Sequence, residues 1–382
     1  MKDRSLLIKK IAFVSSNAWT MYNFRKEVLQ SMLKSGYEIL IIAGYDKCAD
    51  SLITMGCEFI PVTIKNRSVN PLKDIQLFFT LKKIYKKYQP DIVFHYVIKP
   101  NIYGTLAAGL LSIPCVAVIT GLGHAFNKNG ILKAFIKKLY RFSLKYSNEV
   151  WCLNKEDAEY FVRHKIIPLR KLKVLPGEGV NIDHFKKTRS NKNEQGAFTF
   201  LMCARLLKSK GILEYADATS ILQKKRYNFN CFLLGAQEDH PDAISPAQIR
   251  NWKKEGSIQY LGFVDDVRDH LSNCDCFVYP SYYNEGVPRS LLEACGMELP
   301  VITTNNPGCR ELIQDGVNGL LCVMHDRYEL ASKMEEMLLL DKTKRTGMGK
   351  KGRELIEAKY SIERVIKNYY LLLEGLEAGN KY

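Results

Sequence analysis

The stretch NEGVPRSLLEACG at residues 284–296 decides the fold, because it marks where a buried strand gives way to a helix. The run before it, CDCFVYPS at 274–281, is apolar and aromatic, as in a strand that is buried on both faces. Pro288 suits the first position of a helix, and Gly286 lets the backbone turn sharply ahead of it. The pattern therefore predicts a strand, a short loop and then a helix over 290–295.

The two glutamates of this stretch stand on either side of the predicted helix start. Glu285 falls in the loop and Glu293 inside the helix, while the N–H groups of Arg289 and Ser290 would point out of the helix start. A helix start that follows a parallel strand is a favourable place for a phosphate. Two carboxylates beside it can bind hydroxyl groups on both sides of a diphosphate. The alternative, from this stretch alone, is a helix that carries two ordinary solvated acids.

Strand-like and helix-like patterns alternate along the whole chain. Apolar runs such as KIAFVSS at 10–16 and DIVFHY at 91–96 are separated by helical segments at 22–35, 71–88, 100–112, 131–147 and 155–164. A second series of apolar runs starts with FTFLMCA at 198–204. Such alternation predicts an α/β fold in which parallel sheets are covered by helices on both faces.

A polar segment separates the two series and predicts two domains. KKTRSNKNEQG at 186–196 carries no apolar period, so we place the boundary there, giving domains over 1–186 and 187–359. A chain of 382 residues is also long enough for two hydrophobic cores. The fold class expected is therefore two tandem doubly wound, Rossmann-like domains, with a ligand cleft between the carboxyl ends of their sheets.

Positive charge is concentrated in the first half of the chain. Residues 1–186 contain 29 Lys/Arg and 14 Asp/Glu, which accounts for +15 of the net charge of +16. Such a domain is expected to face a membrane, a nucleic acid or a phosphorylated substrate. No apolar run approaches the roughly 20 residues of a membrane span, and no signal peptide is visible. The 11 scattered cysteines fit thiols in a reducing cytoplasm rather than disulfides or zinc ligands.

The loops that follow the strands of the second domain carry its distinctive side chains. Arg205 and Lys210 lie in ARLLKSKG at 204–211, after the first strand, and Gly262 and Phe263 follow the third. If these loops share one sheet edge, Arg205 and Lys210 converge on the phosphate site at 289–290. Arginine gives directional bonds to phosphate oxygens and lysine gives a point charge. Each alone is most often a solvated surface charge, so the prediction rests on their combination.

These residues together resemble a known family. The arginine and lysine after the first strand of domain two, followed by E-G-x-P-x-S-x-x-E-A at 285–294, resemble retaining glycosyltransferases of the GT-B fold, family 4. The resemblance covers the whole chain and implies that the final helix, within 360–382, crosses back to the first domain. MYNFR at 21–25, VIKPNIYGTLAA at 97–108, ITGLGHAF at 119–126 and DHPDAISPAQIRNW at 239–252 resemble a branch that builds bacterial surface glycans, with N-acetylgalactosaminyltransferases acting on undecaprenyl-diphosphate-linked sugars.

The resemblance implies a role for each matching position. Glu293 would bind the ribose hydroxyls of the nucleotide, and Glu285 the hydroxyls of the donor sugar. Arg205 and Lys210 would neutralise the diphosphate. The loop at Gly262 and Phe263 would hold the base through its backbone. The remaining implied site residues are the helix-start residues Gly286, Val287, Arg289 and Ser290, the active-site histidine His124, and the acceptor-side candidates Asn17, Lys99, Asn101, Thr120 and Gly121.

The sequence also departs from the family pattern at three points. The first strand leads into SSNAWTMYNF rather than a Gly-Gly loop, Asn181 stands where an aspartate is common, and Glu298 replaces a glycine that often ends the helix of the two glutamates. A side chain at position 298 disfavours the left-handed backbone that often ends such a helix.

The function implied is a hexosyltransferase that moves a hexose or N-acetylhexosamine from a nucleotide sugar, expected to be UDP-linked, to a polyprenyl-diphosphate-linked saccharide. No Asp-x-Asp motif is present, so we expect cationic side chains in place of a metal and no cofactor. Two alternatives stay open: a nucleotide-sugar 2-epimerase of the same fold, which would need more acids and histidines for proton transfer, and a basic nucleic-acid-binding protein, for which no recognition motif is present.

The segment 130–147 is expected to connect the first domain to a membrane. Its apolar residues, spaced as on one helix face, are expected to pack on the sheet, and its lysines and arginine to form a solvated basic face. A basic face in a domain of net charge +15 suits the anionic cytoplasmic leaflet. We therefore expect a cytoplasmic protein that associates peripherally with the inner face of the cell membrane and has no nucleic-acid partner.

Overall fold

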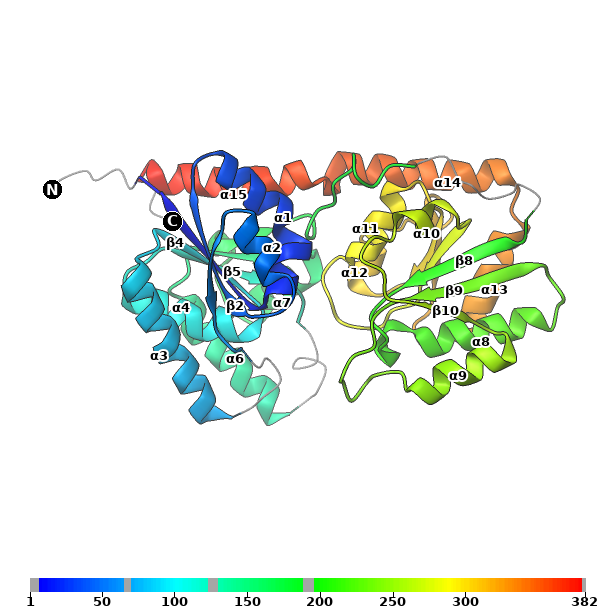
Figure 1. Ribbon diagram of the computed structural model, residues 1–382, viewed down its shortest axis with the longest axis horizontal. Coiled ribbons are helices and arrows are strands. Elements are labelled where there is room, and N and C mark those ends of the chain that lie inside the picture. The colour runs from blue at the N-terminus through cyan, green and yellow to red at the C-terminus, as the bar shows by residue number, and fades with distance from the viewer. Residues whose placement is uncertain (1–6, 65–69, 123–129, 188–195, 380–382) are drawn as a thin grey trace. The chain divides into compact units, whose positions relative to one another are not determined.

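The computed structural model describes residues 7–64, 70–122, 130–187 and 196–379. The chain folds into two compact units (Figure 1). Unit 1 consists of residues Met1–Glu178 and Ile362–Tyr382, and unit 2 of Gly179–Ser361. The chain therefore leaves unit 1 eight residues before the boundary that we placed at 186, since the segment from Gly179 to Lys187 belongs to the second unit.

The described residues of unit 1 form a seven-stranded parallel sheet in the order β3-β2-β1-β4-β5-β6-β7. Its strands are β1 (Lys10–Asn17), β2 (Glu38–Gly44), β3 (Glu58–Pro61), β4 (Ile92–Tyr96), β5 (Cys115–Ile119), β6 (Glu149–Cys152) and β7 (Leu172–Val174). The helices are α1 (Ala18–Lys34), α2 (Ala49–Thr54), α3 (Pro71–Tyr88), the π-helix η1 (Pro100–Gly104), α4 (Thr105–Leu110), α6 (Ile131–Leu144), α7 (Lys155–Arg163), the 3-10 turn η2 (Leu169–Lys171) and α15 (Ile362–Glu377).

The described residues of unit 2 form a six-stranded parallel sheet in the order β10-β9-β8-β11-β12-β13. Its strands are β8 (Phe198–Cys203), β9 (Phe229–Leu234), β10 (Gln259–Gly262), β11 (Cys276–Tyr279), β12 (Val301–Thr304) and β13 (Gly319–Cys322). The helices are the 3-10 turn η3 (Lys208–Lys210), α8 (Ile212–Gln223), α9 (Pro246–Glu255), α10 (Arg268–Ser272), α11 (Arg289–Gly296), α12 (Pro307–Arg310), α13 (Arg327–Leu339), α14 (Lys342–Leu355) and the π-helix η4 (Ile356–Tyr360).

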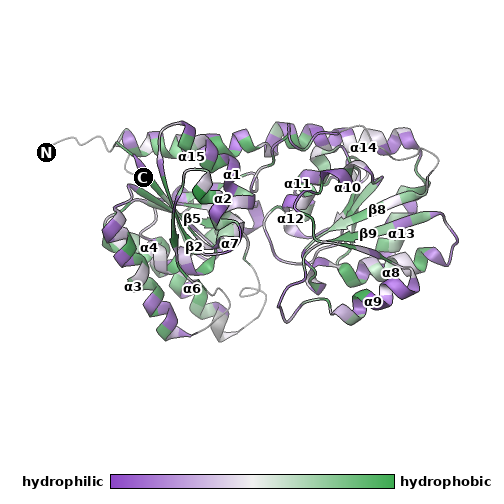
Figure 2. Cartoon of the chain, in the orientation of Figure 1, coloured by the Kyte–Doolittle hydropathy of each residue, from purple (hydrophilic) through white to green (hydrophobic). Residues whose placement is uncertain are grey.

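The predicted α/β class and its two doubly wound sheets are confirmed. Continuous apolar runs became central strands because helices cover both faces of each sheet, and Figure 2 shows these strands as the hydrophobic layer of each unit. β4, β5, β6, β11 and β12 are buried along their whole length. None of the described helices combines the length and the apolar character that a membrane crossing requires.

Two details at helix ends differ from simple expectation. Pro288 is the residue that caps α11 rather than its first helical residue, so the helix starts at Arg289. Glu298 adopts a left-handed backbone with φ of 57° although it is not a glycine. A Cβ built on Gly349 would lie 1.9 Å from the carbonyl oxygen of Glu298, so this turn is held against the backbone of α14. Tertiary packing therefore supports a conformation that a side chain disfavours.

Candidate functional site

The strand order of unit 2 reverses direction between its two central strands, β8 and β11. In open parallel sheets, ligands bind outside the carboxyl ends of the strands at such a switch point. The loop after β8 covers residues 204–211, and the loop after β11 covers 280–288. These loops hold the cationic and acidic residues that the sequence singled out, so the topology brings both sets to one sheet edge.

Backbone contacts fix these two loops to each other. The N–H of Tyr282 donates to the carbonyl of Ser209 at 3.0 Å, and the hydroxyl of Ser281 donates to the same carbonyl at 3.4 Å. Gly211 has φ of 79°, and a Cβ on it would lie 2.1 Å from the carbonyl oxygen of Pro280. Only glycine fits there, because both the left-handed backbone and the close approach exclude a side chain.

Lys210 and Glu285 meet at the centre of the site. The ammonium Nζ of Lys210 lies 2.5 Å from Oε1 of Glu285, and their side chains are only 4% and 21% exposed. The hydroxyl of Tyr279 donates to the same carboxylate oxygen at 2.9 Å and accepts from Lys210 at 2.9 Å. The single O–H of Ser281 is shared between this oxygen, at 3.3 Å, and the carbonyl of Ser209. Burial lowers the pKa of Lys210, and the neighbouring Glu285 opposes that shift.

Arg205 lies in the same loop as Lys210 and has an acidic partner of its own. Its Nη1 is 3.4 Å from the carboxylate of Glu238, which follows β9. The ring of Tyr283 lies beneath both cations, with its centroid 5.9 Å from Arg205 and 4.8 Å from Lys210. Burial would lower the pKa of Arg205, but the nearby Glu238 and Glu285 carboxylates raise it, so the guanidinium keeps its charge.

The start of α11 presents a second acidic group. Nε of Arg289 donates to Oε1 of Glu293 at 3.1 Å, with both side chains more than four-fifths buried. Glu293 also lies close to Cys203, the last residue of β8: burial, reinforced by that carboxylate, raises the pKa of the Cys203 thiol to about 12. Glu293 therefore sits above the switch point. The N–H groups of Arg289 and Ser290 precede the first intrahelical bonds of α11 and stay available to a ligand.

Residues that the sequence did not single out hold the loop after β11 in place. The side-chain amide of Asn306 donates to the carbonyl of Tyr283 at 2.8 Å. A Cβ on Gly308 would lie 2.2 Å from the carbonyl oxygen of Gly286, so α12 supports the backbone beside Glu285. Gly286 and Val287 are buried within this support. Tyr279 was missed because a tyrosine in an apolar strand resembles core, and Glu238 because it lies one residue before the stretch at 239–252 that drew attention.

Gly262 and Phe263 stand at the end of β10, the edge strand. Gly262 has φ of 85°, and its carbonyl accepts from the N–H of Gly235 at 2.9 Å. Phe263 is 45% exposed. That the backbone of this loop holds the nucleobase stays a prediction.

The acceptor-side candidates of unit 1 cluster around its own switch point, between β1 and β4. Asn17 caps α1 by accepting from the N–H of Thr20 at 3.0 Å. Lys99 is buried and pairs with Asp74 of α3 at 2.5 Å. Asn101, within η1, donates to the carbonyl of Val118 at 2.9 Å. These contacts fix the side chains of Lys99 and Asn101 within the unit, and their role toward an acceptor stays a prediction.

The remaining residues of this region are two acceptor-side candidates, a residue with a strained backbone and His124. Thr120 and Gly121 follow β5 and are half-buried. Val97, directly after β4, has φ of 64°, a strained conformation for a β-branched residue and one often found near functional sites. His124 lies outside the described residues.

Arg25, in the MYNFR stretch, is buried where the chain leaves unit 1. Its Nη2 lies 2.5 Å from Oε1 of Glu178, and its guanidinium stacks over Tyr96 at 4.2 Å. Burial would lower the pKa of Arg25, but Glu178 raises it. This arginine therefore anchors Glu178, the residue at which the chain leaves unit 1.

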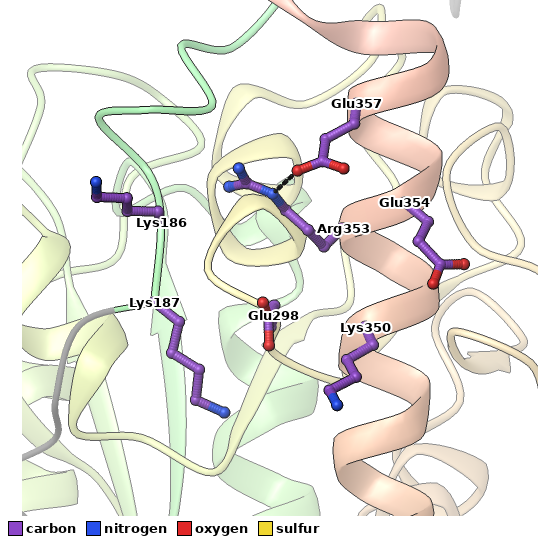
Figure 3. Close-up of a pocket in the computed structure, with 7 residues that line it drawn as sticks. All are labelled: Lys186, Lys187, Glu298, Lys350, Arg353, Glu354 and Glu357. Atoms are coloured by element: carbon purple, nitrogen blue, oxygen red, sulfur yellow. Dashed lines mark hydrogen bonds and ion pairs between the residues drawn. The ribbon is translucent and has the colours of Figure 1, made fainter.

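A separate hollow of about 320 Å³ lies in unit 2 beyond the C-terminal end of α11 (Figure 3). Its lining is entirely charged and consists of Lys186, Lys187, Glu298, Lys350, Arg353, Glu354 and Glu357. Arg353 pairs with Glu357 at 2.5 Å and donates to the carbonyls of Phe185 and Gly296. The arginine therefore serves to join the segment after the domain boundary to α11. Among the described residues, no three or more histidine, cysteine, aspartate or glutamate side chains are gathered so as to hold a metal ion.

Comparison with known proteins adds sequence relatives to this geometry. Residues 183–355 match the family model of glycosyl transferases group 1, and residues 10–154 match the model described as glycosyl transferase 4-like. The N,N'-diacetylbacillosaminyl-diphospho-undecaprenol alpha-1,3-N-acetylgalactosaminyltransferase of Campylobacter jejuni is 28% identical over 379 residues, covering 95% of this chain and 98% of that protein. The UDP-Gal:alpha-D-GlcNAc-diphosphoundecaprenol alpha-1,3-galactosyltransferase of Escherichia coli is 28% identical over 279 residues, covering 70% and 71%.

The fold is shared with solved structures as well. The crystal structure of a glycosyltransferase from Rickettsia africae matches with a TM-score of 0.80 at 21% identity, covering 97% of this chain and 99% of that one. The architecture with two parallel α/β sheets is thus the GT-B fold.

Proposed function

The chain belongs to the group 1 glycosyltransferases, and on that premise we propose that it transfers a hexose or N-acetylhexosamine from a UDP-sugar to a saccharide on polyprenyl diphosphate. The relatives from C. jejuni and E. coli, both named for undecaprenol-linked acceptors, support this acceptor class. The E. coli relative is also named for a UDP-linked donor. The product would serve bacterial surface-glycan synthesis.

One observation carries the donor site: Lys210 and Glu285 form a buried pair at the switch point, beside the start of α11. A nucleotide sugar has hydroxyls at both ends and negative charge between them. Glu293 would bind the ribose and Glu285 the transferred sugar, while Lys210 and Arg205 neutralise the diphosphate. The arrangement thus matches the order of groups along the donor.

These cations would act on the step that breaks the bond to the leaving group. As the bond between the sugar carbon and the diphosphate oxygen breaks, negative charge builds on the nucleotide diphosphate. Preorganised donors at such a charge are worth about 3–4 kcal/mol each. The acceptor hydroxyl would attack the same face of the sugar and pass its proton to the departing phosphate oxygen, so configuration is retained without a covalent enzyme intermediate.

The surface of unit 1 supports a membrane-bound acceptor. Phe135 and Phe142 of α6 are 56% and 53% exposed, although we expected the apolar stripe of this helix to be packed. Ile136 and Leu139 of the same helix pack against the core. On α3, Leu72, Ile75 and Phe79 are also exposed.

Basic side chains stand beside these exposed rings. Lys138, Arg141 and Lys145 are exposed on the same helix face as Phe142. Each basic residue near an anionic leaflet contributes about 1 kcal/mol to binding. We propose that this face binds the inner surface of the cell membrane, where a lipid-linked acceptor is found.

The function can be tested in two steps. Binding of UDP-linked, GDP-linked and dTDP-linked sugars is measured by calorimetry, and the donors that bind are then incubated with a synthetic polyprenyl-diphosphate sugar. We expect UDP-sugar binding and acceptor-dependent transfer. Epimerised UDP-sugar formed without acceptor would indicate a 2-epimerase, and salt-sensitive binding to DNA but not to anionic vesicles would indicate a nucleic-acid-binding protein.

A further inference from the structure

Tyr279 carries a buried polar group in a strand whose other residues are apolar. It ends β11, a strand that is buried along its whole length, and is itself 3% exposed. Its backbone is fixed, because the hydroxyl of Thr303 donates to its carbonyl at 2.6 Å. A tyrosine hydroxyl in such surroundings needs hydrogen-bond partners. Those partners are the two residues of the central pair, each at 2.9 Å.

The chemistry of the three groups fixes the direction of each hydrogen bond. An ammonium can only donate, an ionised carboxylate can only accept, and a phenol does both. The hydroxyl of Tyr279 therefore accepts from Lys210 and donates to Glu285. Lys210 uses one N–H for Tyr279 and one for Glu285 among the described residues, which leaves the third for a phosphate oxygen.

We propose that Tyr279 is a positioning residue that holds the Glu285 carboxylate for the donor sugar while Lys210 serves the diphosphate. This inference rests on the proposed function. Without the phenol, Glu285 would lose the shorter of its two hydroxyl donors, at 2.9 Å against 3.3 Å from Ser281, and would move more readily with Lys210 when the lysine turns toward a phosphate. With it, the carboxylate keeps a donor that does not move with the lysine, since the tyrosine is part of the sheet.

The kinetic test compares Tyr279→Phe with a matched control in the same unit. Tyr215 is equally buried, and its hydroxyl donates to the carbonyl of Phe232 at 3.5 Å, away from the central pair, so Tyr215→Phe removes a buried hydroxyl of structural use only. We expect Tyr279→Phe to bind UDP within twofold of wild type and to lose at least tenfold in kcat. We expect Tyr215→Phe to change neither quantity by more than twofold.

The selectivity of the enzyme among donor sugars shows whether Tyr279 positions Glu285 or only stabilises the fold. The preferred UDP-sugar is compared with a series of analogues that each lack one sugar hydroxyl, so that one of them lacks the hydroxyl that Glu285 would bind. The penalty in kcat/KM for that analogue should shrink at least fivefold in Tyr279→Phe. An unchanged penalty, or a loss of UDP affinity equal to the loss of turnover, would overturn the inference.

A ligand-free measurement keeps the inference testable should the proposed function fail. Thermal unfolding of Tyr279→Phe, Glu285→Gln and the double variant measures the coupling of the two side chains directly. We expect the double variant to lose less in Tm than the sum of the two single losses. Additive losses would show that Tyr279 does not hold Glu285, whereas coupling without any transfer activity would reject the donor assignment alone.

Discussion

Nε of Arg289 lies 3.1 Å from Oε1 of Glu293, one helical turn further along α11. The pair is largely buried, and Nη1 of Arg289 has no hydrogen-bond partner among the described residues. A buried guanidinium N–H without an acceptor costs free energy that a ligand oxygen would recover. The first residue of the helix thus orients the carboxylate assigned to the ribose and still offers a donor of its own.

Glu293→Gln keeps the shape of the side chain but removes its charge. If Glu293 binds the ribose, the loss of a charge-assisted hydrogen bond, about 1.5–3 kcal/mol, should weaken UDP binding by about 10- to 100-fold. Calorimetry with UDP and with the intact donor should show the same loss, because both ligands carry the ribose.

Glu285→Gln is the matched control for that prediction, since it makes the same change eight residues earlier. It should leave UDP binding within about threefold of wild type and lower turnover strongly, because only the sugar meets Glu285. Wild-type affinity of Glu293→Gln for UDP would reject the ribose assignment.

Glu238 pairs with Arg205 in the absence of donor and so competes with the diphosphate. Both side chains are partly exposed, at 27% and 40%, and exposed pairs of this kind are worth about 0.2–1 kcal/mol. Glu238→Gln should therefore tighten UDP binding by up to about fivefold, whereas Arg205→Ala should weaken it. Calorimetric titration with UDP at two salt concentrations measures these changes. Weaker UDP binding by Glu238→Gln would mean that Glu238 itself contributes to UDP binding.

The exposed face of α6 predicts a salt-sensitive membrane interaction. Replacing Lys138, Arg141 and Lys145 by glutamate should lower binding to anionic vesicles by at least about 100-fold, from about 1 kcal/mol per basic residue. A triple variant of unit 2, Lys224→Glu with Lys253→Glu and Lys254→Glu, carries the same charge change and should bind like wild type. Equal losses in both variants, seen by co-sedimentation, would mean that only net charge matters.

Transfer should not depend on a divalent metal. Because Arg205 and Lys210 would carry the positive charge at the diphosphate, activity in excess EDTA should stay within about twofold of that with Mg²⁺. The measurement is the initial rate after exhaustive chelation. Activity that disappears and returns with Mg²⁺ would show that the two side chains are not enough.

His95 makes unit 1 sensitive to acid. The ring is fully buried between Tyr85 and Thr105, and burial lowers its pKa from 6.5 to about 3. The unfolded chain takes up this proton below about pH 6.5 and the folded one does not, so the contribution of His95 is complete above pH 6.5 and is lost as the pH falls toward 3. Urea unfolding at pH 5 against pH 7.5 should show a loss for wild type that exceeds that of His95→Gln by about 2 kcal/mol.

The sequence predicts the fold well because the periods of its apolar residues are local. Parallel strands with both faces covered appear as unbroken apolar runs, and helices at 71–88 and 155–164 match α3 and α7 within a residue. The chain passes between the two compact units at Gly179, eight residues before the predicted boundary at 186, because a polar segment is more visible in the sequence than this position.

Side-chain partners over long distances in sequence are harder to predict. The rule that loops after parallel strands lie at one sheet edge predicted that Lys210 and Glu285 would be close, although they are 75 residues apart. No pattern indicated that Lys99 would be neutralised by Asp74, because that contact depends on where α3 crosses η1. The contacts of Tyr279 and Glu238 were not predicted for the same reason, because their partners are brought near only when the chain folds.

Unit 1 is built from both ends of the chain, and this affects the order in which the protein can fold. α15 contributes Tyr369 to its aromatic core, with ring centroids 4.8 Å from Trp151 and 4.9 Å from Phe94. A ribosome has therefore made all of unit 2 before unit 1 can complete its core. A chain truncated at residue 186 would expose those rings to water, so separate production of the basic half requires residues 362–377 to be rejoined to it, by fragment complementation or by circular permutation.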